Sequence, residues 1–108
     1  MFAHRFSLQL KPNKFAEFTK TFESDVLPLL RRQSGFRDEI TFAAPDGINV
    51  QAVSLWETQK DADDYGKNAH KDVLKKMEGM TAGAPNMHKT TEVMHSTFHQ
   101  IRPGQIAA

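Results

Sequence analysis

The sequence predicts an α+β domain of ferredoxin-like βαββαβ order, with helices on one face of a four-stranded antiparallel sheet. Three observations predict this fold. Residues 2–11, 36–44 and 48–56 have the alternating or apolar character of strands. Residues 15–30 carry apolar side chains at helical spacing. The turn at Pro45-Asp46-Gly47 joins the second and third strands as a hairpin, because proline presets φ and glycine accepts a positive φ.

The first strand places Phe2, His4 and Phe6 on one face, and Pro12-Asn13 ends it. An amphipathic helix of about five turns is expected next. Its apolar residues recur at intervals of three and four: Phe15, Phe18, Phe22, Val26 and Leu29 or Leu30. Pro28 removes one helical hydrogen bond, which predicts a kink in the last turns. Gly35 is the expected stop.

In the second strand, alternation places Phe36, Ile40 and Phe42 on one face. The third strand is apolar or small on both faces at residues 52–55, which indicates a central position in the sheet. Thr58 and Asp61 resemble a capping box at the start of the second helix. That helix is expected to turn Ala62 and Tyr65 inward.

The remaining chain is expected to contain a break at residues 68–70, a short third helix and a loop from Gly79 to Pro85. A final strand is expected from Met87 to Ile101. Residues 1–101 therefore form a single domain, and residues 102–108 form a C-terminal tail.

We expect the helices to cover the sheet face led by Phe2, Phe6 and Phe42. The opposite face mixes apolar and polar side chains: Ser7, Gln9, Thr41, Ala43, Gln51, Val53, Leu55, Val93, His95 and Thr97. Packing against the sheet of a second subunit would explain this mixture. A water-covered, slightly apolar surface is the alternative, since apolar surface is common on monomers.

Composition narrows the functional classes. The chain of 108 residues has 14 Lys plus Arg and 13 Asp plus Glu, so its charge predicts neither nucleic acid nor an anionic membrane as partner. The absence of cysteine excludes disulfides, thiolate metal sites and cysteine nucleophiles. No stretch approaches the roughly 20 apolar residues of a membrane span. The N-terminus begins as a strand without a signal-peptide core, so we expect a cytoplasmic protein.

Trp56 and Tyr65, the only tryptophan and tyrosine, lie on either side of one strand-to-helix corner. Each offers a large ring and a polar group that needs a partner, which suits a pocket for a flat organic molecule. Together with Phe42, Phe22 and Phe6 they are the candidate substrate-binding residues. Packing in the core is the alternative for both rings.

His4 lies among phenylalanines on the inward face of the first strand. It is the candidate general base, because histidine titrates near physiological pH. It could remove a phenolic or carbon-bound proton to give an electron-rich anion that reacts directly with oxygen, and Tyr65 is its candidate catalytic partner. The alternative is a structural histidine bonded to a backbone carbonyl.

The other histidines predict no metal site. Four residues of strand separate His95 from His99 by roughly 13 Å, too far for both to bind one ion. His95 is expected at a subunit interface, His70 at a helix end and His88 at the start of a strand, and their functions are left open. The chain has no phosphate-binding loop or nucleotide fingerprint.

Several short segments, in this order, resemble the antibiotic biosynthesis monooxygenase-type family of the dimeric α+β barrel superfamily. They are Val26-Leu27-Pro28-Leu29-Leu30, Gly35-Phe36, Trp56-Glu57, Ala62 and Tyr65. The resemblance covers roughly residues 2–101. It implies a homodimer whose two sheets form a barrel, with one pocket per subunit between helices and sheet.

The resemblance leaves the reaction open, because this superfamily includes cofactor-free oxygenases, haem-degrading enzymes, small isomerases and proteins of unknown role. The haem-degrading branch looks for Asn, Trp and His where this chain has His4, Tyr65 and Lys75. All three positions depart from that pattern.

The working hypothesis is a cofactor-independent monooxygenase that acts on a small aromatic or quinone-forming compound. A non-catalytic, dimeric module that binds a small hydrophobic ligand is one alternative, and a haem-binding protein is another.

Overall fold

The computed structural model describes residues 1–101, and the predicted tail lies outside them. Its strands are β1 (Phe2–Gln9), β2 (Phe36–Ala43), β3 (Asn49–Trp56), β4 (Asn86–Met87) and β5 (Thr91–Glu92). Its helices are α1 (Phe15–Thr21), the π-helical segment η1 (Phe22–Val26), α2 (Leu27–Arg31), α3 (Gln59–Lys67) and α4 (His70–Lys76). None of the helices described is long and apolar enough to span a bilayer.

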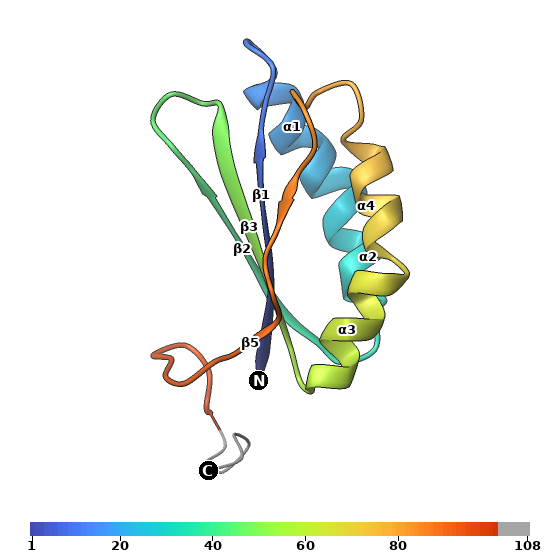
Figure 1. The fold of residues 1–108 in the computed structure, drawn as a ribbon, viewed down its shortest axis with the longest axis vertical. Coiled ribbons are helices and arrows are strands. Elements are labelled where there is room, and N and C mark those ends of the chain that lie inside the picture. Colours follow the sequence, from blue (N-terminus) through green and yellow to red (C-terminus); the bar gives the residue numbers. More distant parts are fainter. Residues whose placement is uncertain (102–108) are drawn as a thin grey trace.

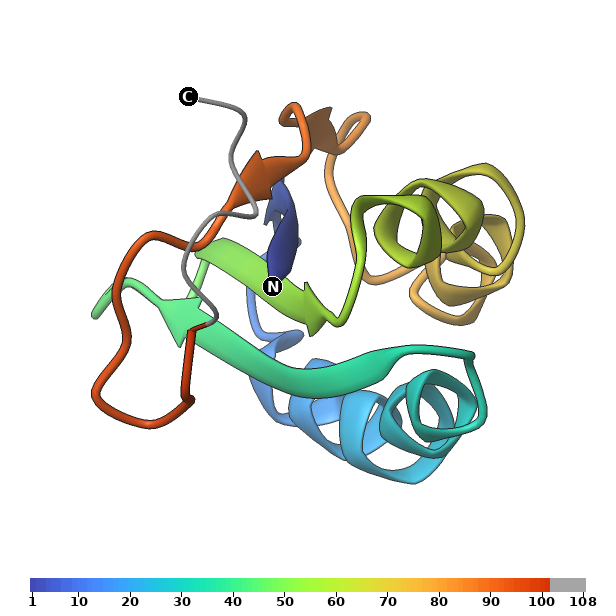
Figure 2. The ribbon, with the colours of Figure 1, turned by 90° about the horizontal axis from the view of Figure 1, so that it is seen from below.

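The sheet is antiparallel, with the order β2-β3-β1-β4 and with β5 also paired to β1. All helices lie against one face of it, as Figure 1 shows, and the two helical rods α1–η1–α2 and α3–α4 run side by side (Figure 2). The predicted α+β fold of ferredoxin-like type is therefore confirmed. The central strand pair is β3 and β1, as the apolar middle of β3 indicated.

The first helical rod is continuous from Phe15 to Arg31 but widens at η1. The backbone N–H of Leu27 bonds to the carbonyl of Phe22, five residues earlier. Pro28 lacks an N–H, and its ring would crowd the carbonyl of Ser24 in a regular α-helix. A wider turn relieves that crowding. The irregularity that Pro28 was expected to cause is therefore a π turn in the residues before it.

The predicted facing of β2 is wrong from Asp38 onward. A β-bulge between Phe36 and Asp38 shifts the pairing by one residue, and a shift of one residue exchanges the two faces of a strand. Phe36 still packs against the core. Ile40 and Phe42, however, face away from the helices, and Phe42 is 55% exposed.

The bulge also turns Glu39, Thr41 and Ala43 to the helix-facing side of the sheet, where they pair with Ser54, Ala52 and Val50 of β3; Glu39 is half-buried there, and Thr41 and Ala43 are exposed. Thr41 and Ala43 were predicted on the opposite face.

The predicted strand from Met87 to Ile101 is much shorter than expected. Within the predicted strand only the short segments β4 and β5 form, both paired with β1, and residues 93–101 have no regular structure. Part of this segment still packs: Val93 and Ile101 contact a small cluster of Met1, Ala3 and Leu55 on the sheet face away from the helices. This outer face also carries a hollow of about 650 Å³, which Phe42, Gln51 and Ser7 help to line.

The corner between β3 and α3 positions Tyr65. Thr58 caps α3 by accepting a hydrogen bond from the backbone N–H of Asp61 (3.1 Å). Gly35, with φ of 80°, lies directly beneath this first turn, and a Cβ there would collide with the Asp61 side chain. The close approach of the two segments therefore requires glycine.

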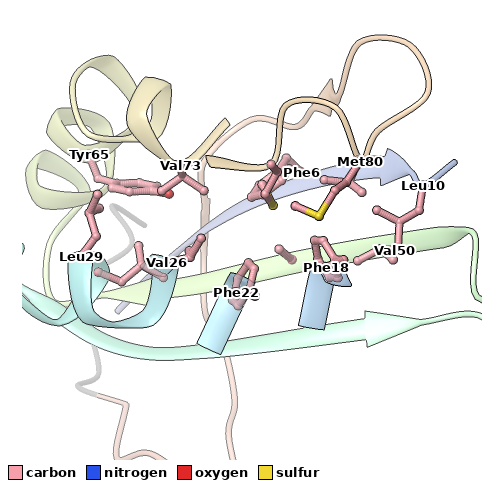
Figure 3. Packing of buried hydrophobic residues seen from close by; sticks show 14 of the residues in the cluster. Phe6, Leu10, Phe18, Phe22, Val26, Leu29, Val50, Tyr65, Val73 and Met80 are labelled. Atoms are coloured by element: carbon pink, nitrogen blue, oxygen red, sulfur yellow. The ribbon is translucent and has the colours of Figure 1, made fainter. Parts of the chain in front are cut away.

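The core fills the space between the helical rods and the sheet. Figure 3 shows Phe6, Val50, Phe18 and Tyr65 pointing into this layer from the strands and both rods. The two rods share one continuous cluster of buried residues, and the alternation of the first strand and the helical spacing of residues 15–30 account for half of its members.

Candidate functional site

The predicted residues His4, Trp56, Tyr65 and Phe6 come together in one buried cluster on the inner face of the sheet. His4 pairs across the sheet with Ser54. The pair of Phe2 and Trp56 lies two residues away on the same, helix-facing side of the sheet. Tyr65 reaches them from α3. Trp56 has 0% of its surface exposed, Tyr65 4% and His4 5%.

The rings in this cluster touch one another. Trp56 and Tyr65 stack with centroids 4.7 Å apart and planes inclined by 25°. His4 meets the edge of Tyr65 at 5.1 Å between centroids. The indole N–H of Trp56 donates to Ser54 Oγ (2.8 Å), and that hydroxyl donates to the carbonyl of His4 (3.3 Å). The polar group of the tryptophan is therefore satisfied within the protein.

His70 completes the cluster, although sequence reasoning placed it only at a helix end. It is the first residue of α4 and is 4% exposed. Its Nδ1 shares a hydrogen bond of 3.3 Å with the Tyr65 hydroxyl. Its ring lies 4.9 Å from that of His4 and 4.8 Å from that of Phe6, between centroids. We call His4, Tyr65 and His70 the histidine cluster.

Burial keeps both histidines neutral. Loss of hydration, with a smaller contribution from the neighbouring His4, lowers the pKa of His70 to about 4. Burial also lowers the pKa of His4, which the charge of Asp63 partly offsets. Burial raises the pKa of the Tyr65 phenol, and the charge of Glu39 adds to that rise. At neutral pH the cluster therefore holds two neutral imidazoles and a neutral phenol.

Two ring nitrogens in this cluster have no hydrogen-bond partner. They are His4 Nδ1 and His70 Nε2, and both are buried. A buried polar atom without a partner is costly and occurs mainly where a site accepts a water or a ligand, or takes part in catalysis. The histidine cluster thus has capacity to bind or to exchange a proton.

Gly66 of α3 allows helix and strand to approach closely at His4. A Cβ at position 66 would lie 3.2 Å from His4 Nε2, closer than ordinary van der Waals contact. Glycine in a helix interior normally costs about 1 kcal/mol relative to alanine. Here it leaves room for the imidazole against the helix.

A hollow of about 290 Å³ lies between the first helical rod and β2. Its helix side consists of Phe15, Phe18, Thr19, Phe22, Glu23 and Leu27, and its sheet side consists of Glu39, Thr41 and Ala43. This volume is at the lower end of the range of about 300–1,000 Å³ for small-molecule sites. We call it the inner hollow. Phe22, a candidate substrate-binding residue, lines it, and Phe42 does not.

Glu39 is the ionisable group on the sheet side of the inner hollow. The Thr41 hydroxyl lies within hydrogen-bond distance of both of its carboxylate oxygens, at 2.9 and 3.0 Å. Burial raises the pKa of Glu39 to about 7, with a smaller contribution from the charge of Asp38 and an opposing one from the Thr41 hydrogen bond. The carboxyl group is therefore poised between its two protonation states near neutral pH.

Glu39 and the histidine cluster share one rung of the sheet. Ser54 pairs with His4 on one side and with Glu39 on the other, and all three face the helices. Neighbouring strands lie about 4.8 Å apart, so the Cα atoms of Glu39 and His4 are separated by roughly 10 Å.

The remaining histidines lie elsewhere. His88 Nε2 is 3.2 Å from Ser7 Oγ on the outer face. His99 Nε2 is 2.9 Å from Asp38 Oδ2, which ties the C-terminal segment to β2. Within residues 1–101, no three His, Asp or Glu side chains are grouped so that they could hold a metal ion.

Sequence reasoning missed Glu39 because regular alternation put it on the outer face. The missed signal is Asp38, which regular alternation would place between Phe36 and Ile40 on a buried face. A charged residue at such a position indicates a bulge.

The sequence matches no protein-family model and no curated protein. Solved structures match throughout the chain. The ActVA-Orf6 monooxygenase of Streptomyces coelicolor, in complex with nanaomycin D, has a TM-score of 0.69 at 15% identity, with 92% of each chain covered. SnoaB, a cofactor-independent oxygenase from Streptomyces nogalater solved as a mutant, has a TM-score of 0.68 at 11% identity over 91% of this chain and 97% of its own.

The NE2512 protein of Nitrosomonas europaea, of unknown function, has a TM-score of 0.72 at 14% identity over 92% of this chain and 94% of its own. At these identities the likeness concerns the fold. The chain has the fold of the antibiotic biosynthesis monooxygenase-type proteins, as the sequence resemblance predicted.

Proposed function

We propose that this chain, which shares its fold with antibiotic biosynthesis monooxygenases, is a cofactor-independent oxygenase of small aromatic compounds. The inner hollow carries the proposal, because it combines walls of Phe15, Phe18 and Phe22 with a carboxyl group on one side. Such a site binds a flat apolar ring and orients one polar substituent. The fold supports the reaction class, since ActVA-Orf6 and SnoaB are a monooxygenase and an oxygenase.

The proposed reaction balances without an external reductant. A hydroxylated ring and O₂ give a quinone and water. The ring loses four electrons and two hydrogens, one oxygen atom enters at a ring carbon, and the other leaves in the water. The protein has to exclude bulk water, hold the ring and accept a proton.

In this proposal oxygen bonds first to the reacting ring carbon. His4 then takes the proton of that carbon, the O–O bond breaks, and the leaving hydroxide takes up the proton to become water. Tyr65 orients the ring. The neutral state of His4 and its unpartnered Nδ1 support the assignment. His4 is 5% exposed. The proposed reaction therefore requires α3 and α4 to move away from the sheet when the substrate enters. Trp56 and Phe6 then border the ring on the side of the histidine cluster.

Oxygen uptake by the purified protein tests the proposal. A panel of phenols and naphthols is supplied without flavin, metal or nicotinamide, and O₂ consumption and quinone absorbance are recorded together. We expect one O₂ consumed per quinone formed. His4→Ala should reduce turnover by roughly 10²–10⁴-fold, the usual contribution of a general base.

His88→Ala is the matched control, because that histidine lies on the outer face and should leave turnover unchanged. Absence of oxygen uptake across the panel would contradict the oxygenase. Full activity of His4→Ala would contradict the assignment of His4 as the base.

A non-catalytic ligand-binding module is the second candidate. The closed stack of Trp56 on Tyr65 favours it, because these rings fill the space that a substrate would need to reach His4. A phenol that binds but is recovered unchanged, with no O₂ consumed, would support this candidate.

We also propose that two copies pair through the outer face of the sheet. Exposed Ile40 and Phe42 and the hollow of about 650 Å³ beside them support this arrangement. Light scattering on the purified protein tests it, and a mass of one chain at micromolar concentration would contradict it.

A further inference from the structure

The β-bulge before Asp38 gives the inner hollow a polar group that regular alternation would have placed outside. Glu39 is turned under the helices on the same rung as Ser54. Its carboxylate lies next to the ring walls Phe18 and Phe22, and these offer it no hydrogen bond. Thr41 provides one hydroxyl donor. A carboxylate can accept about four hydrogen bonds, so Glu39 has capacity for a ligand hydroxyl besides that of Thr41.

The ionisable groups around Glu39 are Glu23, Asp38 and Tyr65, and His99 contacts Asp38 through Nε2 at 2.9 Å. Glu23, on η1, is the second carboxylate among the residues that line the hollow, and it is exposed at the rim. Asp38 precedes Glu39 in the sequence, and its charge raises the pKa of Glu39. The charge of Glu39 in turn raises the pKa of Tyr65 on α3. The helix residues facing the hollow from α1 are Phe15, Phe18 and Thr19, and Leu27 faces it from α2.

Among residues 1–101, no cation forms an ion pair with Glu39, and no Lys, Arg or His lines the hollow. An anionic ligand would therefore meet only repulsion. A neutral ring with a hydroxyl group meets apolar walls and a free acceptor.

We propose that the inner hollow selects neutral hydroxylated aromatic rings, and that Glu39 is the specificity-determining residue, accepting the hydrogen bond of the ring hydroxyl. This inference names the substrate class of the proposed oxygenase and in that sense rests on the proposed function. It assigns Glu39 to binding, whereas His4 remains the proposed base. A hydrogen bond to the carboxylate also shifts electron density into the ring, as oxygen attack requires.

Three ligands that share one ring system separate the possible interactions. They are 1-naphthol, 1-methoxynaphthalene and 1-naphthoate, and their binding is measured by calorimetry without oxygen. We expect 1-naphthol to bind about tenfold more tightly than the methyl ether, the effect of one good hydrogen bond to a charged group. Naphthoate should bind least. Equal binding of naphthol and ether, or no binding of naphthol, would overturn the inference.

Glu39→Gln and its matched control Glu23→Gln test the residue itself. Both remove one carboxylate from the lining, but only Glu39 lies beneath the helices. Glu39→Gln should abolish the preference for naphthol over the ether, and Glu23→Gln should keep it. Loss of the preference in both variants would overturn the inference, because general negative charge would then explain it.

The pH dependence of naphthol binding is an independent test of the role of Glu39. Since a carboxylate accepts hydrogen bonds better than a carboxylic acid, naphthol should bind more tightly as pH rises through about 7. Ether binding should not follow this trend. In the wild-type protein, carboxyl ¹³C NMR should show naphthol lowering the pKa of Glu39 and the ether failing to lower it. This measurement needs no variant, so it tests the inference even if Glu39→Gln does not fold.

The proposed function and this inference can fail separately. Glu39-dependent binding of naphthol without oxygen uptake would refute the oxygenase and leave the hydroxyl site standing. Oxygen uptake that is equally fast in Glu39→Gln, with unchanged naphthol affinity, would refute the hydroxyl site and leave the oxygenase standing.

Discussion

The layer between the helices and the sheet has two halves that differ in packing. Under α3 and α4, the rings of Trp56, Tyr65 and His4 touch one another, and the space is filled. Under the first helical rod, the same sheet face leaves the inner hollow, of about 290 Å³, beside Glu39. The filled half supplies folding stability, and the open half offers room for a ligand.

The two halves also treat their ionisable groups in opposite ways. Burial lowers the pKa values of His4 and His70 and raises that of Glu39. In each case burial favours the neutral form. The histidines end as neutral groups in a closed core, whereas the carboxyl group remains near its titration point beside an apolar hollow. The cluster is closed to a substrate as it stands, whereas the hollow has room for a ligand.

The largest expected effect concerns packing in the filled half. Trp56→Ala should lower the free energy of unfolding by about 3–5 kcal/mol, since it leaves a cavity among fully buried rings. Phe15→Ala, in the hollow wall and 41% exposed, should cost less than about 1.5 kcal/mol. Urea denaturation measures both. Equal losses would mean that the two halves are packed alike.

The next effect concerns the contact between α3 and His4. Gly66→Ala would normally stabilise a helix by about 1 kcal/mol. Here we expect it to destabilise the fold by about 1–3 kcal/mol, because the new methyl group presses on an imidazole held between Phe6, Tyr65 and His70.

A double-mutant cycle isolates this contact. In a His4→Ala background the obstacle is gone, and Gly66→Ala should become stabilising. If Gly66→Ala has the same effect in both backgrounds, His4 does not pack against the helix as described.

The third effect is a pH dependence of opposite sign in the two halves. For His70, with a folded pKa of about 4 against 6.5 unfolded, the unfolded chain binds more protons between these values. Its contribution to stability is therefore present above pH 6.5 and is lost as pH falls toward 4, by at most about 1.4 kcal/mol per pH unit. For Glu39, with a pKa of about 7 against 4.5 unfolded, the folded chain binds more protons. Stability is then lost as pH rises from 4.5 to 7.

Variants separate these two contributions. Glu39→Gln should gain stability relative to the wild type as pH rises from 4.5 to 7, and His70→Gln should be less sensitive to acid than the wild type between pH 6.5 and 4. Thermal melts across this range measure both. A Glu39→Gln profile parallel to that of the wild type would show that Glu39 is not buried in solution.

The sequence predicted the filled half better than the open one, for a physical reason. His4, Phe6, Trp56 and Tyr65 follow from regular alternation along β1 and β3 and from the first turns of α3, and the structure brings them together. Glu39 follows from a single bulge, which moved it and Phe42 to faces opposite those predicted. Periodicity carries no information across a bulge.

His70 lies at a helix end as predicted, but its burial and the irregular course of the chain after Met87 were not predicted, for related reasons. His70 is the first residue of α4, which begins just after the break that ends α3. This position places its ring against Tyr65 in the buried cluster. The segment 93–101 has alternating residues but pairs with no strand among residues 1–101 beyond one backbone hydrogen bond from Val93 to Met1, and it is irregular. Both outcomes depend on tertiary placement that local patterns do not contain.

The smallest effect tests the face that the bulge left outside. Phe42 is 55% exposed, so Phe42→Ala should cost about 0.5 kcal/mol or less in a dilute single chain, as surface substitutions do. If two copies pair through this face, the same variant removes apolar area from their interface, and the loss should grow with protein concentration. Denaturation at two concentrations about a hundredfold apart distinguishes these cases. A large loss that is equal at both concentrations would mean that Phe42 packs within its own chain, and the assignment of β2 faces on which the inner hollow depends would then be wrong.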